Sequence, residues 1–182
     1  MQRRTKILTF AAFITLSSLC DLAAGEQPVS LAKPLEPLRS FIGKTWKGQF
    51  INSKSEKPSY DVARWERALN GQAVRVLHSV NEGEYGGETI ITWNSKAGRL
   101  EFYYFTTAGY STHGTIAIEN GKLITQEEVT GNESDVTAVK ATTEILSDGR
   151  MHTKSRYLKK GEWVDGHEII YGESPGAEVL FK

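Results

Sequence analysis

Four histidines are the residues of this chain best suited to metal or acid–base chemistry. They are His78, His113, His152 and His167, and they lie 15 residues or more apart. None has a second histidine or a cysteine at the short spacing that zinc sites use. We therefore expect no structural or catalytic metal site.

Residues suited to hydrolytic chemistry are also few. The sequence has no Gly-x-Ser-x-Gly motif for a serine nucleophile, and its single cysteine, Cys20, lies close to the N-terminus. Glu127 and Glu128 are adjacent, but neighbouring side chains of a strand point to opposite faces, so they cannot act as a carboxylate pair. Because charged side chains are rarely buried, we expect Glu66, Glu127 and Arg64 on the solvated outer wall, although Glu66 or Glu127 could meet Arg64 inside the barrel. We leave enzymatic activity open and favour a protein without it.

Short β-strands are the elements that would position these residues. Ten β-prone stretches follow one another from Lys44 to the C-terminus, and glycine or asparagine turns separate them. Asn70-Gly71, Asn120-Gly121 and Asp148-Gly149 are typical of tight hairpins. Gly86-Gly87 also indicates a turn, before a strand that we expect to begin at Glu88. Connections this short pair each strand with its neighbour in sequence, and closure removes the unpaired edges of the resulting sheet. The sequence therefore predicts an all-β fold, an antiparallel up-and-down β-barrel of about ten strands.

Alternation along these strands identifies side chains that would face the barrel interior. His78 shares one face of its strand with Val74, Val76 and Val80. The same rule gives a set of mixed aromatic and polar candidates for a ligand-binding lumen: His78, Ile91, Trp93, Phe102, Tyr104 and Thr143. Such side chains either line a pocket or fill the core, and the sequence leaves both alternatives open.

The N-terminal residues have the features of an export signal. A basic start precedes the apolar run from Ile7 to Leu19, which is too short to span a bilayer, and small residues follow it. We expect a signal peptide over residues 1–25, an extended or disordered leader over 26–37, and one barrel domain over 38–182 that begins with a short helical cap. The mature protein would be periplasmic or secreted, without a transmembrane segment.

Charge and cysteine content narrow the partners of the mature chain. Removal of residues 1–25 would take away three of 22 basic and one of 22 acidic residues, which leaves a net charge of about −2. This balance gives no basic face for nucleic acid, so we expect no nucleic-acid partner. The removed segment also contains the only cysteine, so the domain must be stable without disulfides.

Several motifs resemble those of the calycin superfamily of lipocalins, fatty-acid-binding proteins and nitrobindin-like barrels. The segment from Phe41 to Gly48 places a glycine and Trp46 at the start of the first strand, one residue off the usual Gly-x-Trp spacing. Residues 67–71, 82–87, 93–98 and 109–114 are similar to an uncharacterised bacterial lipocalin-like family. The resemblance covers most of the mature chain and implies a fold, not a reaction.

The resemblance also implies roles for three residues. In calycins the opening tryptophan packs across the barrel floor beneath a basic side chain from a late strand, and here Trp46 and Arg156 would form that structural pair. Nitrobindin-like barrels hold haem through one histidine near the C-terminus, and His167 is the residue nearest that position. Its polar neighbours Asp165 and Glu168 favour a surface or turn histidine instead.

We therefore expect an exported, non-catalytic binder of a small apolar or amphipathic molecule, with no cofactor. One alternative is a haem protein of the nitrobindin type. Another is a filled barrel that acts as an envelope interaction module through exposed aromatic side chains, namely Tyr103, Phe105, Tyr110 and Trp163.

Overall fold

Ten β-strands make up most of the computed structural model, which describes residues 30–182 except 54–56 and 132–134. The predicted signal peptide lies outside the described residues. The strands are β1 (Lys44–Phe50), β2 (Tyr60–Ala68), β3 (Ala73–Val80), β4 (Tyr85–Asn94), β5 (Arg99–Thr106), β6 (Ser111–Glu119), β7 (Lys122–Val129), β8 (Val136–Ile145), β9 (Met151–Lys159) and β10 (Glu162–Glu173). Three 3-10 segments accompany them: η1 (Lys33–Phe41), η2 (Leu69–Gly71) and η3 (Asn81–Gly83).

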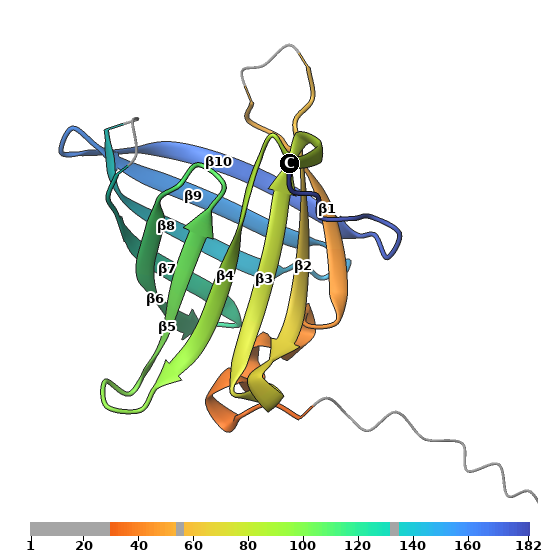
Figure 1. The fold of residues 1–182 in the computed structure, drawn as a ribbon, viewed down its shortest axis with the longest axis vertical. Helices are drawn as coiled ribbons and strands as arrows, with labels where there is room; N and C mark the ends of the chain where they lie inside the picture. Colours follow the sequence, from red (N-terminus) through yellow and green to blue (C-terminus); the bar gives the residue numbers. More distant parts are fainter. Residues whose placement is uncertain (1–29, 54–56, 132–134) are drawn as a thin grey trace, which may run out of the picture.

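The sheet closes on itself. Each strand pairs antiparallel with its neighbours in sequence, and β1 pairs with β10 from Trp46–Glu173 to Phe50–Ile169. Figure 1 shows the blue C-terminal strands wrapping round to meet β1. The predicted all-β, ten-stranded, up-and-down barrel is therefore confirmed. No described strand is left with an unpaired edge, which follows from the short hairpin connections.

The predicted start of the fourth strand was wrong. We expected a turn at Gly86-Gly87 and a strand from Glu88, but β4 begins at Tyr85. At Gly87 a Cβ atom would overlap the backbone carbonyl of Phe105 and the ring of Tyr104. Glycine is required here because the Tyr104 ring lies directly against the strand, so these glycines serve close packing within a strand.

η1 lies at the barrel end that contains the β2–β3 connection (Figure 1). The Ala32 N–H donates to the Gly71 carbonyl at 2.8 Å, and Leu35, Leu38 and Phe41 are buried in the same cluster as Trp46. The expected extended leader therefore does not reach Pro37, because the 3-10 segment already begins at Lys33. Burial of these apolar side chains outweighs the weak helical preference of a proline-containing stretch.

The predicted pairing of Trp46 with Arg156 was wrong. Trp46 is fully buried, its indole N–H points at the Phe41 carbonyl at 3.4 Å, and the cation over its ring is Lys44, at 5.1 Å. Arg156 pairs with Asp165, eight positions along β10 from the Glu173 partner of Trp46, and its side chain is 55% exposed. The cation over the Trp46 ring therefore comes from Lys44, two residues earlier in the sequence, and not from a late strand as the resemblance implied.

None of the described helical segments is long and apolar enough to cross a membrane.

Candidate functional site: the barrel lumen

The barrel interior contains a cavity of about 640 Å³. Five of the six predicted lumen residues line it: His78, Ile91, Phe102, Tyr104 and Thr143. The alternative of a filled barrel is therefore not what the structure shows. Trp93 does not line the cavity and is 40% exposed, although it shares the strand face of Ile91. It is the next-to-last residue of β4, so the strand carries it past the end of the lumen.

The lining is apolar toward η1 and polar toward the opposite end. Near η1 it is mostly apolar, with side chains such as Trp65, Ile91, Leu123 and Met151 beside the hydroxyl pair of Thr143 and Thr153. Toward the far ends of the strands lie the side chains of Asp61, His78, Tyr85 and Glu127, together with Tyr110 from the connection before β6. The His78 side chain keeps 22% of its surface exposed, whereas Trp46 at the other end keeps none. The cavity is therefore amphipathic along its length.

A continuous chain of hydrogen bonds crosses the polar half. Asp61 accepts from the Tyr171 hydroxyl at 2.9 Å and from His78 Nδ1 at 2.8 Å. His78 Nε2 lies 2.7 Å from the Tyr104 hydroxyl, whose oxygen lies 3.0 Å from that of Tyr85. The Tyr85 hydroxyl in turn lies 3.1 Å from that of Tyr110. Six side chains, five from strands and Tyr110 from the connection before β6, are thus held in fixed orientations around the lumen.

Burial makes these phenol groups hard to ionise. It raises the pKa of Tyr85 and of Tyr104, and the pKa of Tyr171 lies well above its ordinary value because the ring is buried beside Asp61. Each hydroxyl therefore keeps its proton at neutral pH. The chain orients neutral hydroxyl groups and offers no phenolate nucleophile.

Glu127 also faces the lumen, which corrects its expected place on the outer wall. It lines the cavity and accepts a hydrogen bond from the Thr112 hydroxyl, while Glu128, on the opposite face of β7, is exposed. Burial raises the pKa of the Glu127 carboxyl. Glu66 and Arg64 form an ion pair at 2.8 Å on the partly exposed outer wall, so Arg64 does not accompany Glu127.

Alternation could have identified the polar residues that sequence reasoning missed. Asp61 has the same parity as Trp65, and Tyr171 the same parity as Ile169, and all four line the cavity. Asp61 was not predicted because a buried carboxylate is unusual. Tyr110, expected among the exposed aromatics, also lines the cavity, whereas Tyr103 and Phe105 are 45% and 53% exposed.

His167 lines the cavity as well, so the expected surface or turn position was wrong. The register of β10 against β9 shifts between Asp165 and Glu168, which marks a β-bulge with one extra residue in β10. On one side of the bulge His167 faces inward and contacts the Tyr157 hydroxyl through Nδ1. On the other side Asp165 points outward and is 78% exposed. The bulge is what separates the orientations of these two residues.

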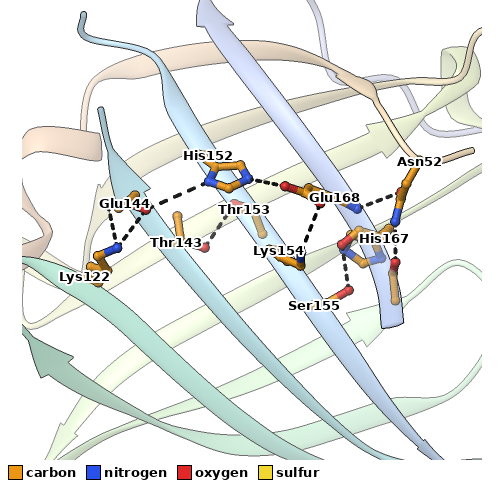
Figure 2. A network of polar contacts seen from close by, with 11 residues as sticks. Asn52, Lys122, Thr143, Glu144, His152, Thr153, Lys154, Ser155, His167 and Glu168 are labelled. Atoms are coloured by element: carbon orange, nitrogen blue, oxygen red, sulfur yellow. Dashed lines mark hydrogen bonds and ion pairs between the residues drawn. The ribbon is translucent and has the colours of Figure 1, made fainter. Parts of the chain in front are cut away.

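The Asn52 side chain holds the bulge in place. Its amide donates to the Gly166 carbonyl at 2.7 Å, and its oxygen accepts from the Glu168 N–H at 3.0 Å (Figure 2). These bonds satisfy backbone groups that the bulge withdraws from the ladder.

The histidine of the outer wall has a different environment. Lys122, Glu144, His152 and Glu168 form a row across β7, β8, β9 and β10 (Figure 2). His152 Nε2 lies 2.9 Å from Glu168, and this hydrogen bond is the main reason that the pKa of Glu168 is lowered. The remaining histidine, His113, stacks on Tyr103 with ring centroids 4.5 Å apart. Within the described ranges, no three His, Cys, Asp or Glu side chains come together as a potential metal site.

The lumen fits a haem poorly. His167 keeps one ring nitrogen without a hydrogen bond to any described residue, so a ligand atom is present. However, no lysine or arginine lines the described lumen to pair with the propionates of a haem, and the lining instead contributes two carboxyl groups, Asp61 and Glu127. We therefore assign no haem site to this cavity.

No family model and no curated protein matches this chain.

Proposed function

We propose that this protein is an exported, non-catalytic binder that holds a small apolar or amphipathic molecule in the barrel lumen. The observation that carries the proposal is the 640 Å³ cavity with one apolar and one polar half. Pockets of this size and composition are typical of small-molecule sites, in which a few oriented polar groups fix an otherwise apolar ligand. The N-terminal sequence supports export to the periplasm or the outside of the cell.

In this proposal η1 serves as the cap of the barrel. Leu35 and Leu38 are fully buried beside Trp46, so this end excludes water. An apolar tail directed toward η1 would contact side chains such as Ile91 and Leu123. Polar atoms of the ligand would then lie among the hydroxyl and carboxyl groups of the other half. Ligand exchange would take place through the polar end.

The lining also supports binding over catalysis. The tyrosine hydroxyls keep their protons, and both oxygens of Asp61 are engaged by Tyr171 and His78. These groups are oriented but not activated, which suits recognition.

A bulky substitution in the lumen tests this proposal. Thr143 lines the cavity and its hydroxyl lies 3.0 Å from that of Thr153, whereas Thr142 lies on the opposite face of β8. In Thr143→Trp the indole would occupy ligand space, and we expect the affinity for the neutral dye N-phenyl-1-naphthylamine to fall at least about tenfold. Thr142→Trp is the matched control and should bind the dye like the wild type.

Circular dichroism would confirm that both variants fold. Unchanged dye binding by folded Thr143→Trp would show that the lumen is not the binding site. Native mass spectrometry of the freshly purified protein adds an independent test, because a co-purifying lipid or metabolite supports the proposal. A haem mass with a Soret band would instead favour the haem alternative, and a ligand-free protein that binds no dye would favour an interaction module.

A further inference from the structure

The titratable side chains that line the described lumen include carboxyl groups and imidazoles, and none of them is a permanent cation. Two carboxyl groups, Asp61 and Glu127, and two histidines, His78 and His167, line the cavity, and no lysine or arginine does so within the described chain. Burial lowers the pKa of His167, so this imidazole is neutral at neutral pH. A ligand with a carboxylate head group would therefore find no fixed positive charge in the cavity.

The two carboxyl groups differ in what they offer a ligand. Asp61 is 3% exposed, and its two oxygens accept hydrogen bonds from His78 and Tyr171. Glu127 accepts one hydrogen bond from Thr112, through Oε2. Its Oε1 has no donor among the described residues, and no side-chain oxygen or nitrogen of those residues is both fully buried and unpaired. Oε1 of Glu127 therefore faces the cavity and is open to a donor from the ligand.

Tyrosine side chains line the same cavity as this carboxyl group, among them Tyr85, Tyr110 and Tyr157. The Tyr85 hydroxyl lies 3.1 Å from that of Tyr110. Electrostatic interaction with Glu127 contributes to the raised pKa of both Tyr85 and Tyr157, for which burial is the main cause. Tyrosine rings with a carboxylate are the side chains that favour a cationic nitrogen, through cation–π attraction and charge pairing.

We propose that the lumen selects amphipathic ligands with a protonated amine head group, and that Glu127 is the residue that pairs with this head group. This inference rests on the proposed function, because it specifies the ligand class of the same cavity. The ammonium group would donate to Oε1 of Glu127 and the hydrocarbon part would extend toward η1. A buried carboxyl group without a cation partner is costly to ionise, and the bound ammonium offsets that cost.

Three probes of equal chain length test the inference: decylamine, decanol and decanoate, each titrated calorimetrically at pH 7. We expect decylamine to bind the wild type at least about tenfold more tightly than decanoate, with decanol between them. In Glu127→Gln the preference for decylamine over decanol should disappear, while decanol affinity stays within about threefold of the wild type. Glu128→Gln, whose side chain points to solvent, is the matched control and should keep the wild-type order.

The outcomes separate this inference from the proposed function. If no probe and no neutral dye binds the wild type, the lumen binds no such ligand and both proposals fail. If decanol or decanoate binds as tightly as decylamine, the proposed function stands and the amine selectivity is wrong. If decylamine is preferred by Glu127→Gln as much as by the wild type, Glu127 is not its partner. Because the wild-type ranking needs no variant, it tests the selectivity even if Glu127→Gln does not fold.

Discussion

The Asp61 carboxylate organises the polar half of the lumen. It is nearly inaccessible to solvent and accepts hydrogen bonds from two other strands, through His78 of β3 and Tyr171 of β10. Burying a charge is costly unless hydrogen bonds compensate for it, and here each oxygen has a donor. Asp61 therefore orients neighbouring side chains, which leaves Glu127 as the carboxyl group available to a ligand.

His167 gives a pH-dependent prediction. Burial lowers its pKa, so the folded protein binds a proton on this ring less readily than the unfolded chain does. The stabilising contribution is therefore complete above the ordinary histidine pKa of about 6.5 and is lost as the pH falls from there through the folded value. We expect two-dimensional NMR of the ring C–H signals to show a titration midpoint for His167 below the ordinary value of about 6.5.

A titration midpoint at or above 6.5 for His167 would contradict this prediction. The signal can be assigned by its loss in His167→Gln, and comparison with His113→Gln, which removes a half-exposed histidine, identifies the resonance of a ring in contact with solvent.

Glycines within the strands make room for aromatic side chains that line the lumen. At Gly48 of β1 a Cβ atom would lie 2.6 Å from the Tyr171 ring, which belongs to its cross-strand partner on β10. At Gly114 of β6 it would overlap the ring of its partner, Phe102. The aromatic ring of each pair thus occupies the space above a glycine. This arrangement lets large rings line a narrow barrel without displacing the strands.

Gly48→Ala tests this packing between β1 and β10. The added methyl group must displace the Tyr171 ring, which would also lengthen its hydrogen bond to Asp61. We expect a loss of about 1–3 kcal/mol in the free energy of unfolding, measured by urea denaturation. Gly172→Ala, next to Tyr171 in β10, is the matched control because a Cβ there meets nothing within 4 Å. Equal effects of the two substitutions would mean that close packing at Gly48 is not the cause.

The sequence predicts elements of this protein better than it predicts the contacts between them. Dipeptides such as Asn120-Gly121 adopt the positive φ values that tight hairpins need, so strand order and closure were predictable. Gly86-Gly87 is also a dipeptide that favours turns, but it lies inside β4. Its glycines are needed there because the Tyr104 ring, from another strand, packs directly against Gly87. The inward position of His167 likewise depends on a bulge in the pairing of β9 with β10.

The candidate site was predictable to the extent that it follows from alternation. His78, Phe102 and Tyr104 line the cavity as their parity indicates. Parity fails for Trp93 because it does not say where along the barrel axis the lumen ends. Parity also does not say which of two adjacent carboxyl groups faces inward. Glu127 and Glu128 lie on opposite faces of β7, and the direction in which the sheet curls decides which face becomes the lumen.

At the scale of the whole molecule, the pairing of β1 with β10 creates the lumen. Tyr171 of β10 reaches Asp61 of β2 across β1, and Gly48 lies between them in the sheet order. The polar chain that begins at this junction then continues through β3, β5, β4 and the residue preceding β6. An open sheet would separate Tyr171 from Asp61 and expose both to water. Closure and the order of the polar half therefore depend on each other.

Hydrogen exchange tests this closure in solution. In a closed barrel every strand has two partners, so the amides of β1 and β10 should exchange about as slowly as those of β4 and β5. We expect protection factors within about tenfold of one another for ladder amides of these four strands, measured by NMR or mass spectrometry at pH 7. The turn at Gly109 is an internal control for fast exchange, because it lies in an exposed connection. Fast exchange confined to β1 and β10 would show that the barrel opens at this junction, and the cavity would then lack the shelter from water that ligand binding requires.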